Sequence, residues 1–82
     1  MNIEETSKIL AMIALVENRK FTDEQIGAWQ VLLKDIEFMH ANEAVVRYYR
    51  MQTEPVKPAN IYRLAKEVKV ELSKKQYGNP NL

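Results

Sequence analysis

The sequence predicts an all-α protein, a compact orthogonal bundle of four helices with no sheet. The 82 residues include only two glycines, Gly27 and Gly78, and no segment alternates apolar and polar residues between turn signals, as a half-buried strand would. Apolar residues instead recur at spacings of three and four in four separate segments. Two of these segments also begin with clear helix-start signals.

The first helix is expected over residues 3–16. Asn2 can cap it, and Glu5 three residues later completes a capping box. The apolar residues expected on one face are Ile9, Met12, Ile13 and Val16. Others, Leu10, Ala14 and Leu15, widen the apolar surface around the helix. This excess predicts a central, widely covered helix, and the alternative is a face on which copies of the chain self-associate.

The second helix has the clearest start in the sequence and is expected to begin at Asp23. Thr22 and Gln25 delimit a capping box, and Phe21 and Ile26 occupy the two positions of a hydrophobic staple. The inward stripe then runs through Ile26, Trp29, Leu33 and Ile36, with Leu32 beside it. Trp29 is expected to anchor the core.

Two further helices are expected on either side of a proline-containing loop. The third covers residues 38–52, and Pro55 and Pro58 prevent its continuation, so that residues 53–57 form the loop. Pro58 suits the first position of the fourth helix, where its missing N–H costs nothing. The expected inward residues are Phe38, Ala41, Val45 and Tyr48 on the third helix, and Ile61, Leu64, Ala65, Val68 and Leu72 on the fourth.

Length and composition predict one small domain, residues 1–75, followed by a flexible C-terminal tail, residues 76–82. A chain of 82 residues has material for a single core, and 46% apolar with 28% charged residues is ordinary for a folded protein. There is no cysteine, and the longest apolar run, Ile9 to Val16, is too short to span a membrane. We therefore expect a cytoplasmic protein.

Charge is distributed unevenly along the chain. Residues 1–46 hold four Lys or Arg against eight Asp or Glu, whereas residues 47–82 hold eight against three. Such an asymmetry can steer a charged partner, and it can also reflect the solvated faces of helices. The basic half is the natural place to look for a binding surface.

The sequence offers no catalytic constellation, and we expect neither enzymatic activity nor a cofactor. Its serines, Ser7 and Ser73, lie far apart in expected helices, and no glycine-rich loop could hold a phosphate. The only histidine, His40, could approach Glu37 and Glu43, but metal sites in helical bundles need more ligands of this kind. His40 is therefore expected at the surface or its boundary, without a metal. The protein should act by binding another macromolecule.

A nucleic-acid interface is one reading of the basic half. Tyr48, Tyr49 and Tyr62 alternate with arginines, as in proteins that stack bases and neutralise phosphates. The residues for such a helix-turn-helix-like regulatory protein would be Arg47, Arg50, Lys57, Arg63, Lys66 and Lys69. The low total positive charge and the proline-containing loop make this the alternative and not the leading hypothesis.

Three stretches carry a resemblance to a known family. They are the stapled start Phe21–Ile26, its continuation Trp29–Ile36, and Pro58–Ile61 at the opening of the last helix. Over roughly residues 5–70 the chain resembles the N-terminal domain of bacteriophage replicative helicase loader/inhibitor proteins. The resemblance implies a helical domain without enzymatic activity, followed by a flexible segment that contacts a hexameric helicase. It also implies a role in delivering helicase to a phage origin complex and restraining it until then.

The leading hypothesis is a phage or prophage DNA-replication accessory protein in a bacterial host. Its partner would be a replicative helicase or another replisome protein, with nucleic acid as the second choice. The residues expected to meet this protein are Arg63, Lys66, Lys69, Lys74 and Lys75.

Overall fold

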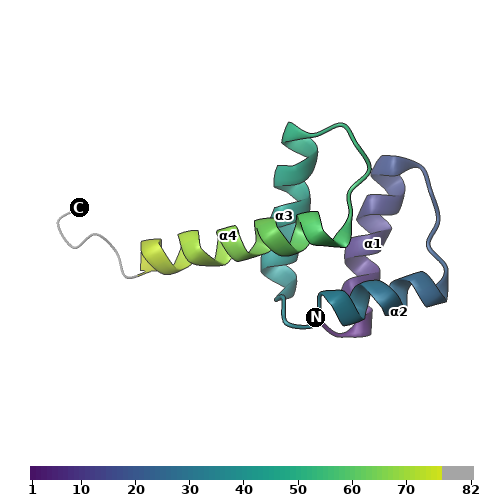
Figure 1. The fold of residues 1–82 in the computed structure, drawn as a ribbon, viewed down its shortest axis with the longest axis horizontal. Coiled ribbons are helices and arrows are strands. Elements are labelled where there is room, and N and C mark those ends of the chain that lie inside the picture. Colours follow the sequence, from purple (N-terminus) through teal and green to yellow (C-terminus); the bar gives the residue numbers. More distant parts are fainter. Residues whose placement is uncertain (77–82) are drawn as a thin grey trace.

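The computed structural model describes residues 1–76, with side chains through residue 74, and contains four helices and no strand within this range. The helices are α1 (Ile3–Glu17), α2 (Asp23–Leu32), α3 (Phe38–Met51) and α4 (Pro58–Gln76). In Figure 1, α2 and α4 run across the direction of α1 and α3. The predicted all-α fold is confirmed. No helix among the described residues is long and apolar enough to cross a membrane.

The first two helices begin where the capping signals place them. Asn2 accepts a hydrogen bond from the Glu5 backbone N–H at 2.8 Å, and the Glu5 carboxylate accepts one from the Asn2 N–H at 3.1 Å. Thr22 and Gln25 make the same reciprocal pair at the start of α2. These bonds satisfy backbone donors that a helix start otherwise leaves unpaired. Both predicted capping boxes are confirmed.

The stripe expected along the second helix is only partly helical. α2 ends at Leu32, and Leu33 and Ile36 lie beyond it, although both remain buried. The N-terminal ammonium of Met1 donates hydrogen bonds to three carbonyls of this connection, those of Leu33, Lys34 and Ile36, at 3.3, 2.9 and 2.7 Å. Carbonyl groups past the end of a helix need such donors when they are buried. The turn thus buries its apolar residues without continuing the helix.

The core lies between the four helices. Its buried apolar side chains are Met1, Ile9, Leu10, Ile13, Trp29, Leu33, Ile36, Ala41, Ala44, Val45, Tyr48, Val56, Ile61, Ala65 and Val68. Most residues of the predicted stripes belong to this set, and Phe21 packs edge-on against Trp29 with ring centroids 5.7 Å apart. Trp29 is buried, as expected of an anchor.

Three apolar residues of α1 and α2 that were expected to be covered are instead exposed. Leu15 and Val16 lie near the end of α1, where the chain turns away through Asn18 in the left-handed conformation. The neighbouring helices cover the Ile9 and Ile13 side of α1 and leave this end open. Leu32, expected beside the α2 stripe, is 57% exposed.

The fourth helix packs chiefly on α3 and then continues past it. Figure 1 shows its last turns extending beyond the rest of the bundle. Ile61, Ala65 and Val68 are buried along its first part, but Leu72, four residues after Val68, is 40% exposed. Leu72 was expected in the core, but it belongs to the last turns of α4, which extend beyond the other helices and leave it partly exposed. Gln76 still belongs to α4; the rest of the expected tail, residues 77–82, lies outside the described residues.

A buried carboxylate fixes the loop that leads into α4. Glu17, at the end of α1, accepts a hydrogen bond from the Val56 N–H at 2.7 Å and another from the Tyr49 hydroxyl, and it pairs with Arg19 at 2.8 Å. The Tyr48 hydroxyl donates to the loop carbonyls of Glu54 and Pro55, with the shorter bond at 3.0 Å. The loop and the first turn of α4 are therefore held to the body by side chains of α1 and α3.

Candidate functional site

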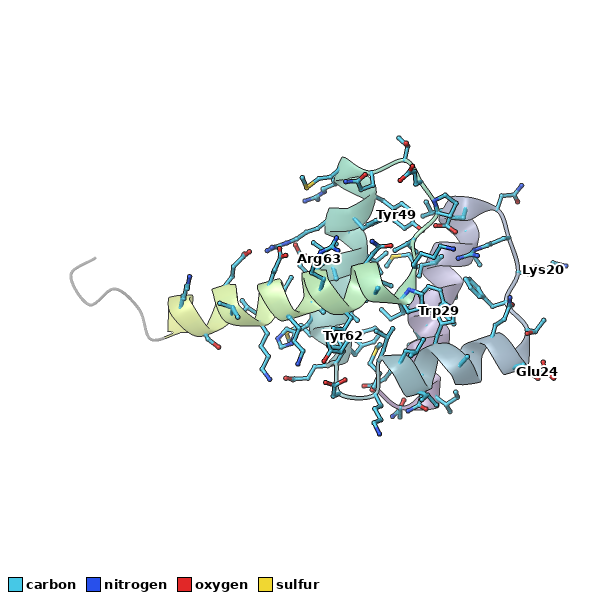
Figure 2. All side chains as sticks on the ribbon, in the orientation of Figure 1. Lys20, Glu24, Trp29, Tyr49, Tyr62 and Arg63 are labelled. Carbon is cyan, nitrogen blue, oxygen red and sulfur yellow. The ribbon has the colours of Figure 1, made fainter. Side chains whose placement is uncertain are left out.

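Two shallow hollows lie side by side along α4 and meet at Tyr62. The first has a volume of about 600 Å³ and is lined by Tyr62, Arg63, Lys66, Glu67, Val70 and Glu71. The second has a volume of about 490 Å³ and is lined by Leu32, Lys57, Pro58, Ala59 and Tyr62. We refer to these lining residues, together with Lys69 and Lys74 on the last turns, as the α4 surface. Figure 2 shows Tyr62 and Arg63 reaching out from the helix.

Large apolar side chains form the middle of the α4 surface. Leu32 is 57%, Tyr62 37% and Val70 52% exposed. Helical spacing places residues 62, 66 and 70 in one row on the outer side of α4, because side chains four apart lie one above the other. Single exposed apolar residues are common on proteins, but here three of them line adjoining hollows.

Tyr62, which both hollows share, contacts two charged side chains, Asp35 and Lys66. Its hydroxyl donates to the Asp35 carboxylate at 3.1 Å, and the Lys66 ammonium lies 5.1 Å from the centre of its ring and 3.6 Å from the same carboxylate. The Tyr62 hydrogen bond, with the nearby Lys66 charge, lowers the pKa of Asp35 below its ordinary value. Asp35 follows α2, so this contact also joins α4 to the turn after α2.

A second ion-pair group lies between α3 and the outer part of α4. Arg47 binds the Glu71 carboxylate through both terminal nitrogens, at 2.7 and 2.8 Å, and its Nε contacts Glu43 at 3.1 Å. The hydrogen bonds that Arg47 donates to these two carboxylates, Glu71 first, raise the pKa of Arg47 above its ordinary value. Its charge is therefore compensated within the protein.

The residues predicted to meet a protein partner all lie on α4. Arg63 and Lys66 line the first hollow, and Lys69 and Lys74 are exposed on the later turns. Lys75 is also in α4, but its side chain lies outside the described residues. Lys66 pairs with Asp35, whereas Arg63, Lys69 and Lys74 make no ion pair with the described residues.

The residues predicted for nucleic-acid binding are more scattered. Arg47 and Arg50 lie on α3, Lys57 lines the second hollow, and Arg63, Lys66 and Lys69 lie on α4. Arg47 and Arg63 also line a crevice of about 350 Å³ between α3 and α4. Because Arg47 and Lys66 are already paired with carboxylates, the set offers fewer uncompensated cations than the sequence alone indicates.

The sequence did not point to Leu32 and Val70 as part of a surface. Leu32 is predicted to lie beside a core stripe, and no prediction falls on Val70. Tyr62 is predicted only as a residue that stacks on bases. The sequence does contain one sign of this surface. Residues 62, 66 and 70 follow one another at spacings of four, on a different side of the helix from the buried Ile61, Ala65 and Val68.

His40 and Tyr49, two further titratable side chains, do not line the hollows of the α4 surface. His40 is buried, more so than the boundary position expected for it, because it lies one helical turn before the buried Ala44 on α3. Its Nδ1 lies 3.8 Å from Glu37. No group of three His, Cys, Asp or Glu side chains in residues 1–74 is arranged to hold a metal ion. Burial and the adjacent Glu17 carboxylate raise the pKa of Tyr49 above its ordinary value.

Comparison of the chain with protein-family models, with curated proteins and with solved structures finds no match. A functional assignment therefore depends on the α4 surface and on the sequence motifs already described.

Proposed function

We propose that this chain is a non-enzymatic DNA-replication accessory protein of a phage or prophage, which binds a replicative helicase or another replisome protein through the α4 surface. It would act in the cytoplasm of the bacterial host. The single observation that carries the proposal is the α4 surface itself, where three exposed apolar side chains adjoin cations that lack a partner among the described residues.

The choice of partner class follows from that combination. Protein interfaces have an apolar, desolvated centre with a polar or charged rim, and Tyr and Arg are enriched there. Leu32, Tyr62 and Val70 supply the apolar centre, while Lys57 and Arg63 supply part of the rim. The hexameric helicase is named as the first candidate because of the resemblance to phage loader/inhibitor proteins over roughly residues 5–70.

The direct test is the affinity of the full chain for a bacterial hexameric replicative helicase, measured by calorimetry or sedimentation. We expect binding that is weakened by Lys69→Glu on the α4 surface. The matched control is Lys20→Glu, which makes the same charge change on the exposed loop between α1 and α2, away from α4 (Figure 2). Absence of binding would exclude the helicase as partner, and equal weakening by both variants would exclude the α4 surface.

A salt titration separates this proposal from DNA binding. A protein that neutralises several phosphates loses affinity by orders of magnitude between low and moderate salt, whereas an interface with an apolar centre is less sensitive. Tight, strongly salt-dependent binding to duplex DNA, with none to helicase, would contradict the proposal in favour of a DNA-binding regulator.

A further inference from the structure

We infer that the α4 surface receives an acidic amphipathic helix of the partner protein, lying along α4 with its apolar side on Leu32, Tyr62 and Val70. This inference rests on the proposed protein-binding function and specifies the chemistry of the partner segment. Its support is the distribution of charge around the apolar residues and the shape of the two hollows.

The cations of the α4 surface are not balanced by its own carboxylates. Lys66 is paired with Asp35, and Glu71 is engaged by Arg47. Lys57, Arg63, Lys69 and Lys74 make no ion pair with the described residues, and among the described acidic residues of α4 only Glu67 likewise makes none. The excess charge is therefore positive, and a complementary segment carries acidic side chains.

The arrangement of apolar residues fits a partner helix better than an extended partner segment that inserts one side chain. The stretch from Ala59 to Val70 spans about 17 Å along the axis at about 1.5 Å per residue, which matches about three turns of a partner helix. Leu32 and Tyr62 flank one hollow, and Tyr62 and Val70 flank the other, so each hollow can take one large apolar side chain. Anchors at spacings of three, four and seven on one helix face are the usual way to fill such a row.

A carboxylate in the first hollow bears on the alternatives. Glu67 lines this hollow and makes no ion pair with the described residues, so it would repel a phosphate backbone or an anionic lipid headgroup that ran along α4. A partner helix avoids this repulsion because it can place a neutral or basic side chain opposite Glu67 and acidic ones opposite the lysines. Glu67 therefore favours those acidic partner helices that place a neutral or basic side chain opposite it.

The test uses three synthetic helical peptides of about four turns and the full chain. One peptide carries a leucine stripe with glutamates at its edges, the second replaces the glutamates by lysines, and the third keeps the acidic composition but scrambles the stripe. Fluorescence anisotropy measures their affinities at fixed salt. We expect the acidic amphipathic peptide to bind at least about tenfold more tightly than either control, since both complementary charge and a continuous stripe are required.

Variants of the chain locate the site. Lys69→Glu should weaken binding of the acidic peptide about fivefold or more, the size expected for an exposed charge pair lost and replaced by repulsion. Val70→Ser should also weaken it, Glu67→Lys should strengthen it, and Lys20→Glu should leave it unchanged. All four residues are exposed, and circular dichroism confirms that each variant is folded before titration.

The outcomes separate this inference from the proposed function. Helicase binding that depends on Lys69, with no preference for the acidic amphipathic peptide, would overturn the inference and leave the proposed function standing. Preferential peptide binding that depends on Lys69 and Glu67, without helicase binding, would support the inference and redirect the search to another partner. Peptide binding unaffected by Lys69→Glu would overturn the inference.

Discussion

The two parts of α4 have the same amphipathic pattern and different surroundings. From Pro58 to Val68 the helix buries Ile61, Ala65 and Val68 against the body. The last turns of the helix extend beyond the rest of the bundle (Figure 1), and in this outer part Val70 is 52% and Leu72 40% exposed. Burial of an apolar stripe therefore depends on which element packs beneath it. It also explains why one helix can support the fold and present a binding surface.

The largest expected effect comes from the buried part of the helix. Ile61→Ala should lower the free energy of unfolding by about 2–5 kcal/mol, because it removes a fully buried side chain and leaves a cavity. Leu72→Ala, the matched change on the outer part, should cost less than about 1 kcal/mol, because the side chain is partly solvated. Urea denaturation measures both values. Equal losses would mean that the outer part is packed as tightly as the inner part.

Alkaline pH should lower the free energy of unfolding, by less than the Ile61→Ala substitution does. Burial and the Glu17 carboxylate raise the pKa of Tyr49 in the folded state, so the fold favours the neutral phenol. The associated stability is fully present below the tyrosine pKa of the unfolded chain, about 10, and is lost as pH rises from there through the raised pKa of the folded state.

The measurement is the urea midpoint at increasing pH above neutrality, for the wild type and Tyr49→Phe. Tyr49→Phe should show a shallower decline above about pH 10, since it has no proton to lose at this position. Parallel curves for wild type and Tyr49→Phe would show that the contact with Glu17 does not stabilise the neutral phenol.

A smaller and local effect is expected at the outer part of α4. Glu71→Gln removes the carboxylate that Arg47 binds through two nitrogens, so amide hydrogen exchange in residues 70–74 should become faster by a few fold while the thermal midpoint hardly changes. Glu43→Gln removes only the pair within α3 and should leave these amides as they were. A drop in the free energy of global unfolding with Glu71→Gln would contradict the view that the outer part of α4 opens independently of the core.

Local signals in the sequence predicted most of the fold. The capping boxes at Asn2 and Thr22, and Pro58 at a helix start, depend on neighbouring residues, and each predicted start is confirmed. The turn after α2 was not predictable from neighbouring residues, because hydrogen bonds to its carbonyls come from Met1, which is distant in the sequence. The exposure of Leu72 was not predictable either, because helical spacing does not show where the neighbouring helix stops.

The candidate site was predicted less completely than the fold. The sequence placed Arg63, Lys66, Lys69 and Lys74 together because they share one basic helix. It could not show that Arg47 and Lys66 are neutralised by Glu71 and Asp35, since each pair joins residues distant in the sequence. Leu32 comes from α2 and meets α4 only in the folded chain, so its place beside Tyr62 required the structure.

Amide hydrogen exchange, measured on the free chain and on the chain saturated with replicative helicase, locates the surface that binds the partner. In the free chain we expect strong protection at residues 61–68 and weak protection at residues 70–74. Added helicase should increase protection along residues 57–74 and leave α1 unchanged. Protection that rises on α1 while α4 stays as it was would contradict the assignment of α4 as the binding surface.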